Sequence, residues 1–144
     1  MISTQSTQSI KSFTEKDYNT LSYKIIECCM EVHKELGPGL MESVYEICAE
    51  AEMKKAGLFV QRQVVLPVTF KGEKLAKEFV IDTIVNDLII LEFKSVEIIL
   101  PVHEAQLVTY LKLADKKLGL LINFNVSLLK EGIRRKINGN LNSV

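Results

Sequence analysis

The chain has little of what marks secreted, disulfide-stabilised or membrane proteins. Its 144 residues include three cysteines, two histidines, three prolines and no tryptophan. An odd number of cysteines, two of them adjacent, is a poor disulfide framework, so we expect a reducing, cytoplasmic environment. No apolar run reaches the roughly 18 residues that a membrane helix needs, so we expect no contact with membranes. The polar N-terminus lacks the apolar core of a signal peptide, and none is expected.

The chain also has no excess of positive or negative charge. Lysine plus arginine and aspartate plus glutamate both number 18, for a formal net charge of zero. This balance argues against a protein that coats nucleic acid by bulk charge, although it allows a local basic groove. Apolar residues make up 47% of the chain, enough for one domain with its own core. We expect a flexible tail over residues 1–17 and a single domain over residues 18–144.

Apolar periodicity predicts an α/β (α+β) fold with a mixed sheet flanked by helices. The expected helices cover residues 18–36, 41–56 and 102–114. The expected strands cover residues 59–70, 77–85, 88–96 and 119–124, with an edge strand or short helix at 128–138. Because a helix connects the strand at 88–96 to the strand at 119–124, these two strands should be parallel.

The first candidate site residues are Glu92 and Lys94, which lie two apart on a strand and so share a face. The same spacing occurs at Glu52-x-Lys54 and Asp115-x-Lys117, but both of these lie in or beside expected helices. Only the first pair lies in an apolar strand, where charged groups are costly unless paired or metal-bound. A structural ion pair at the strand end is the alternative, and spacing alone does not decide.

Asp82 favours a metal site because it interrupts the neighbouring apolar strand. A two-residue loop at Asn86–Asp87 would place Asp82 opposite Leu91. A three-residue loop or a bulge would place it opposite Glu92 on the same face. Two carboxylates must converge to bind a metal, so we predict an odd-length loop or a bulge.

Carboxylate oxygens and water are hard ligands that suit Mg²⁺ or Mn²⁺. A bound ion would polarise a phosphodiester and lower the pKa of a water molecule. In that role Lys94 would orient or deprotonate the water and stabilise the developing charge. The pattern therefore predicts phosphodiester hydrolysis.

Two helices carry further candidates. Glu42, Tyr45 and Glu46 share one helical face, although an acidic residue in a first turn is also favoured by the helix dipole. On the later helix, His103, Gln106 and Tyr110 share a face, and such a polar rim is commonly structural.

The motifs together resemble the small GxxExxY proteins of the PD-(D/E)XK nuclease superfamily. The resemblance rests on GPGLMESVYE, VID, LEFK, PVHEAQLVTYLKL and LGLLINFN, and it runs from about Leu21 to Asn138. It implies a restriction-endonuclease-like fold and a catalytic set of Lys94, Gln106, Glu42, Asp82 and Glu92. Asp82, Glu92 and Glu42 would be the metal ligands, and His103, Tyr110 and Tyr45 are further candidates. Where the family has a Tyr-Arg pair before the first acid, this chain has Glu78-Phe79-Val80-Ile81, which puts one phosphate contact or buried ion pair in doubt.

Several alternatives follow from the same residues. The favoured partner is DNA, and a homodimer or a protein partner is also allowed. An inactive nuclease-fold module for protein interaction or dimerisation is the second hypothesis. A zinc site built from His33, His103 and the cysteines is a weaker one, because the spacing matches no zinc pattern. Basic side chains that could line a groove are Lys71, Lys74, Lys77, Lys112, Lys116, Arg134, Arg135 and Lys136.

Overall fold

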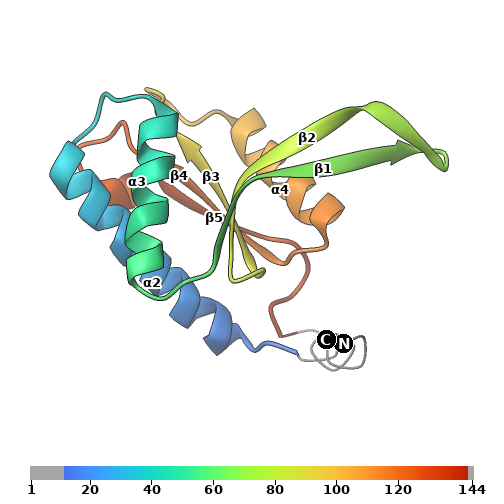
Figure 1. Ribbon diagram of the computed structural model, residues 1–144, viewed down its shortest axis with the longest axis horizontal. Helices are drawn as coiled ribbons and strands as arrows, with labels where there is room; N and C mark the ends of the chain where they lie inside the picture. The colour runs from blue at the N-terminus through green and yellow to red at the C-terminus, as the bar shows by residue number, and fades with distance from the viewer. Residues whose placement is uncertain (1–11, 143–144) are drawn as a thin grey trace.

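A five-stranded mixed sheet organises the molecule, with α2 and α3 on one face and α4 on the other (Figure 1). The computed structural model describes residues 12–142. The strands lie in the order β1-β2-β3-β4-β5. The elements are α2 (Glu15–Leu36), α3 (Glu42–Lys55), β1 (Val60–Phe70), β2 (Glu73–Val85), β3 (Ile89–Lys94), α4 (Pro101–Ala114), β4 (Leu118–Asn123), η1 (Leu129–Gly132) and β5 (Ile133–Ile137). The expected α+β fold with a helix-flanked mixed sheet is confirmed.

The observed elements follow the predicted ones closely, with small shifts at their ends. α2 begins at Glu15, because the Thr14 hydroxyl accepts from the backbone N–H of Asp17 and the Asp17 carboxylate accepts from that of Thr14. Residues 15–17 of the expected tail are therefore helical, and residues 1–11 lie outside the described part. The segment at 128–138 contains both of its alternatives, the short helix η1 and the edge strand β5. Between residues 12 and 142, no helix is both long and apolar enough to cross a membrane.

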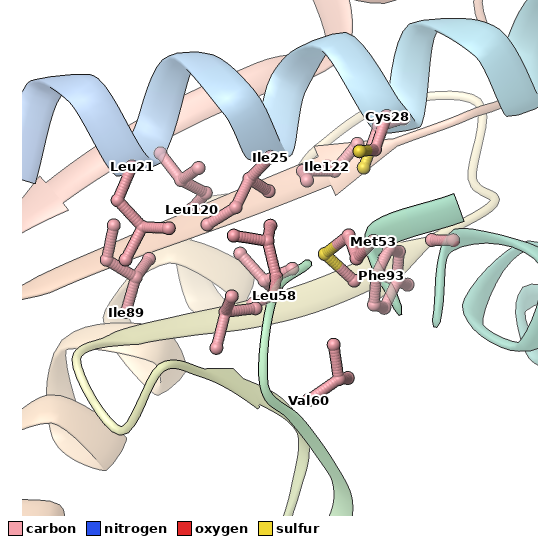
Figure 2. Close-up of a cluster of buried hydrophobic side chains, with 14 of the residues drawn as sticks. Leu21, Ile25, Cys28, Met53, Leu58, Val60, Ile89, Phe93, Leu120 and Ile122 are labelled. Atoms are coloured by element: carbon pink, nitrogen blue, oxygen red, sulfur yellow. The ribbon is translucent and has the colours of Figure 1, made fainter. Parts of the chain in front are cut away.

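Two apolar layers hold the sheet. On one face, α2 and α3 bury side chains such as Ile25 and Met53 against Phe93 of β3 and Ile122 of β4 (Figure 2). On the other face, Leu107 and Leu111 of α4 pack with a smaller set of strand residues. β4 is buried along its whole length, which is why its sequence up to Ile122 has no polar or charged side chain.

The central strands fix the position of the site. β3 and β4 are parallel, with Glu92 beside Leu121 and Lys94 beside Asn123. The predicted parallel pairing across the α4 crossover is therefore confirmed. β2 runs antiparallel to β3, so the chain reverses between two strands that each carry acidic residues.

β1 and β2 form a long hairpin that projects beyond the rest of the sheet (Figure 1). Near its base, Val60 packs in the α2–α3 layer, whereas farther out Val64 packs in the α4 layer. The change of face occurs at Gln63, which has a left-handed φ of 52° within the strand. A non-glycine residue seldom adopts this conformation in a strand, and here it accompanies the sharp twist of the hairpin.

Candidate metal and nuclease site

The β2–β3 loop has the odd length that a shared carboxylate site requires. β2 pairs with β3 through Val85–Ile89, Ile84–Ile90 and Thr83–Leu91, so the loop is the three residues 86–88. Asn86 and Asp87 both adopt a left-handed φ, of 52° and 54°. The next pair along the register is Asp82 with Glu92. The prediction of an odd-length loop is confirmed, and the two acids are brought side by side.

At this pair, hydrogen bonds between side chains and backbone replace the backbone-to-backbone hydrogen bonds of the sheet. The backbone N–H of Asp82 donates to Oε2 of Glu92 at 3.0 Å, and the backbone N–H of Phe93 donates to Oδ2 of Asp82 at 3.0 Å. One oxygen of each carboxylate therefore accepts a hydrogen bond from the backbone of the opposite strand. Within residues 12–142, Oδ1 of Asp82 and Oε1 of Glu92 accept no hydrogen bond from another residue.

Burial and the charges of nearby carboxylates disfavour the charged forms of both acids. Burial, with a contribution from the charge of Asp82, raises the pKa of Glu92 to about 8. Burial also raises the pKa of Asp82 to about 6, although the N–H of Phe93 opposes this shift. Two adjacent carboxyl groups with raised pKa values create a local demand for positive charge, which a cation can meet.

Lys94 supplies part of that positive charge. It is half-buried at the end of β3, and its charge lowers the pKa values of both Asp82 and Glu92. None of the ion pairs formed by residues 12–142 includes Lys94. The ion pair that the structural alternative requires between Lys94 and an acid at the strand end is therefore not formed among these residues. The ammonium group remains available to a ligand.

The chain after Lys94 is held in place by β4. The carbonyl of Lys94 accepts from the backbone N–H of Phe124 at 2.9 Å. The buried Asn123 side chain accepts from the N–H of Val96 at 3.0 Å and donates to its carbonyl at 2.8 Å. This pair of bonds fixes the turn that leaves the site.

Glu42 reaches the same strand end from the first turn of α3. Its Oε2 accepts from the backbone N–H of Ser95 at 3.2 Å, and the Ser95 hydroxyl donates to the carbonyl of Leu40 at 2.6 Å. The charge of Glu42 contributes to the raised pKa of Asp82. In the part of the chain that the structure describes, however, no three acidic, histidine or cysteine side chains converge closely enough to form a metal site. Glu42 thus lies at the rim of the acidic pair.

Tyr45 shapes the loop before α3 and does not face the two acids. Its buried hydroxyl donates to the carbonyl of Gly37 at 2.6 Å and accepts from the N–H of Leu40 at 3.0 Å. Its ring stacks on Phe124, with 4.3 Å between the ring centroids. Tyr45 therefore positions Glu42 by tying the glycine loop to the core.

Glu46 lies next to the acidic pair in the electrostatics of the site, although the catalytic and metal-ligand set that the resemblance implies omits it. It is 5% exposed, and its Oε1 accepts from Nε of Arg62 at 3.2 Å and from Nε2 of Gln63 at 2.8 Å. Its charge contributes to the raised pKa values of Asp82 and Glu92. In the sequence, its position one helical turn after Glu42 was the feature that could have placed Glu46 near the site. No comparable feature marked its partners on β1, Arg62 and Gln63.

The candidates on α4 lie at different depths. Tyr110 is buried, and burial together with the charges of Glu92 and Asp82 raises its pKa. Gln106 is exposed one turn earlier. His103 accepts through Nδ1 from the backbone N–H of Leu100 at 3.0 Å, so it caps the start of the helix. Of these three, Tyr110 is electrostatically coupled to the acids.

The zinc alternative finds no support among residues 12–142, where no such ligand cluster exists. Nε2 of His33 lies 2.8 Å from the carbonyl of Val126. Cys28 and Cys29 are buried on α2. The two cysteines therefore belong to the hydrophobic core, and His33 contacts the backbone of the segment that follows β4.

Several of the basic residues predicted to line a groove are engaged elsewhere. Lys116 pairs with Asp87 at 3.0 Å, and Lys136 pairs with Glu104 at 2.8 Å. Arg135 donates to Asn19 at 2.7 Å. The lysines of the β1–β2 hairpin form no such ion pairs with residues 12–142.

The geometry has the form of an acidic pair and a lysine on adjoining strands, and comparison with protein families agrees. The family model of the PD-(D/E)XK nuclease superfamily matches residues 19–136. The chain belongs to the PD-(D/E)XK nuclease superfamily. No curated protein and no solved structure matches it.

Nucleases of this superfamily typically depend on a divalent metal ion, and the donor chemistry here fits one. Asp82 and Glu92 each offer an oxygen that no residue of the described part hydrogen-bonds. Oxygen donors of this kind suit hard cations such as Mg²⁺. A bound cation would also stabilise the charged forms of both acids, which burial and nearby carboxylates disfavour.

Proposed function

We propose that this protein is a metal-dependent nuclease that hydrolyses phosphodiester bonds in DNA. The observation that carries the proposal is the convergence of Asp82 and Glu92 where β2 and β3 exchange side-chain hydrogen bonds. A purely structural pair of buried carboxyls would be destabilising at neutral pH without a cation. Superfamily membership supports nuclease-type chemistry at this position.

In this proposal Asp82 and Glu92 hold Mg²⁺ or Mn²⁺, and Glu42 contributes from the rim. The ion, when bound, supplies Lewis acidity toward the scissile phosphate and lowers the pKa of a water molecule. Lys94 orients that water and stabilises negative charge on the phosphate as it develops. Its freedom from an ion pair in the described residues leaves its three donors available for this role.

The remaining candidates have supporting roles. Gln106 is exposed on the face of α4 that includes Tyr110, and its amide can donate to a substrate phosphate. Tyr110 closes the site on the α4 side. Tyr45 and His103 are positioning residues, because their hydrogen bonds fix the loop before α3 and the start of α4.

We also propose membership of the GxxExxY group within the superfamily. The three motif positions act as one unit. Gly39 takes a φ of 99° in the loop, Glu42 reaches Ser95, and Tyr45 ties the loop to the core. This coupling of a loop, a carboxylate and a buried hydroxyl is a physical reason for the spacing of the motif.

Cleavage assays with a matched lysine control test the proposed function. Wild type, Lys94→Ala and the exposed-site control Lys130→Ala would be incubated with Mg²⁺ or Mn²⁺ and linear, circular and single-stranded DNA, and with RNA. We expect wild type and the control to cut DNA, and Lys94→Ala to lose about 10²-fold or more of the rate. Cleavage of RNA alone would show that the substrate is RNA and not DNA. No cleavage of any nucleic acid would favour the inactive interaction module.

A further inference from the structure

The outer part of the β1–β2 hairpin carries several apolar side chains that are about half exposed or more than a third exposed. We call residues 64–81 the hairpin arm. Val65, Phe70, Leu75 and Val80 are 52%, 61%, 40% and 42% exposed. A two-stranded ribbon is marginally stable alone in water, and exposed apolar side chains grouped on it mark an interaction surface.

The tip of the arm, residues 70–77, has an excess of positive charge, with three lysines and one acidic residue, Glu73. Lys71, Lys74 and Lys77 are exposed, and none of them forms an ion pair with the residues that the structure describes. Nζ of Lys71 lies 5.5 Å from the centre of the Phe70 ring. The tip therefore presents an aromatic ring beside several unpaired ammonium groups.

A hollow with the opposite character lies between α2 and α3, and we call it the α2–α3 groove. Its volume is about 350 Å³, which is at the small end of protein pockets. Its apolar lining comes from Val32, Leu36, Cys48 and Ala51, and its acidic lining from Glu31, Glu35 and Glu52. Glu52 pairs with Lys55 at 3.4 Å, whereas Glu31 and Glu35 form no ion pair within residues 12–142.

The two surfaces cannot meet within one molecule. The arm tip and the α2–α3 pair lie at opposite ends of the long axis (Figure 1). We propose that the arm tip of one copy docks into the α2–α3 groove of a second copy. Phe70 enters the apolar lining, and the tip lysines pair with Glu31 and Glu35.

Charge complementarity favours a second copy over nucleic acid as the occupant. Glu73 and Glu78 alternate with the lysines on the arm, which weakens it as a phosphate-binding strip. The exposed apolar residues of the arm would gain nothing from a phosphate backbone. The α2–α3 groove, by contrast, supplies both an apolar lining and unpaired carboxylates.

Docking through the arm tip also fits the way in which the sheet edge is protected. β1 is an edge strand, and it carries Pro67 and a register shift between Pro67 and Thr69. Both features discourage strand-to-strand pairing. Two copies side by side and antiparallel would each offer an arm to the other's groove, which gives a closed two-fold dimer.

Sedimentation equilibrium with a charge exchange tests the proposal. The arm variant is Lys71→Glu with Lys74→Glu, the groove variant is Glu31→Lys with Glu35→Lys, and Lys130→Glu is the control. We expect wild type and the control to dimerise, each double variant to weaken the dimer about tenfold or more, and a variant with all four changes to recover it. Phe70→Ser should also weaken the dimer, and its exposed position leaves the fold intact, as circular dichroism would show.

Three results would overturn the proposal. They are a wild type that stays monomeric at high micromolar concentration, a dimer that none of the variants weakens, and a variant with all four changes that does not recover the dimer. A monomeric wild type whose DNA affinity falls in the arm variant would assign the arm to nucleic acid instead. None of these outcomes depends on whether the protein cleaves DNA.

Discussion

Asp82 on β2 forms one hydrogen bond with Glu92 on β3 and a second with its neighbour Phe93. Glu92 accepts from the backbone of Asp82, and Asp82 accepts from the backbone of Phe93, each at 3.0 Å. The same atoms that hold the strands together thus orient the two carboxylates. This relationship links the stability of the fold to the charge of the site.

That link predicts an unusual dependence of stability on pH in the metal-free protein. The folded pKa of Glu92, about 8, lies above its ordinary value of 4.5, so between these values the folded state binds more protons than the unfolded state. The free energy of unfolding should therefore fall as pH rises from about 5 to about 8. Urea unfolding in the presence of a chelator would measure it for wild type and Glu92→Gln. The fall should be smaller in the variant, and parallel pH profiles would contradict the assignment.

Removal of the Tyr45 hydroxyl should destabilise the loop before α3. Tyr45→Phe keeps the stack on Phe124 but removes the hydrogen bonds to Gly37 and Leu40. We expect a loss of about 1–3 kcal/mol in the free energy of unfolding. Tyr23→Phe, at a side chain 74% exposed, is the matched control and should cost close to nothing. Equal effects of the two changes would refute the positioning role.

Thr83 offers the opposite change, a stabilising substitution. It is 1% exposed, and its hydroxyl has no hydrogen-bond partner within the described part of the chain. Thr83→Val replaces an unsatisfied buried hydroxyl with a methyl group of similar size, so it should stabilise the protein by about 1 kcal/mol. Thr69→Val, at an exposed position on β1, should have little effect. A destabilised Thr83→Val would indicate that the hydroxyl has a partner.

Gly132 has no space for a side chain. A Cβ atom there would overlap the backbone carbonyl of Asn123, the residue that holds the turn after Lys94. Gly132→Ala should cost roughly 3 kcal/mol or more, because backbone must move. At Gly119 the nearest atoms belong to the side chain of Leu107, which can move, so Gly119→Ala should cost less. Thermal unfolding of both variants compares them, and the reverse order would contradict this packing.

The sequence was sufficient to predict the fold and the acidic pair because both depend on simple periodicity. The buried run at β4 and the crossover through α4 give parallel neighbours. The requirement that Asp82 and Glu92 share a face then predicts an odd-length loop or a bulge, and the structure has the three-residue loop. Each of these steps uses the two-residue period of strands or the rule that a helical crossover connects parallel strands.

The network around Glu46 could not be predicted in the same way. It depends on Gln63 taking a left-handed φ in the middle of a strand, and glutamine gives no local signal for that conformation. The contact of Glu46 with Arg62 joins α3 to β1, two elements whose packing local sequence does not specify. Such features arise from tertiary packing and not from local pattern.

The central claim is that Asp82 and Glu92 form a divalent metal site, and calorimetric titration of Mn²⁺ tests it most directly. Wild type, Asp82→Asn and the distant exposed control Asp115→Asn would be titrated at pH 8 and at pH 6. We predict binding by wild type and the control that weakens at pH 6, where protons compete for the acids, and no binding by Asp82→Asn. Failure of wild type to bind Mn²⁺ at millimolar concentration, or unchanged binding by Asp82→Asn, would contradict the account.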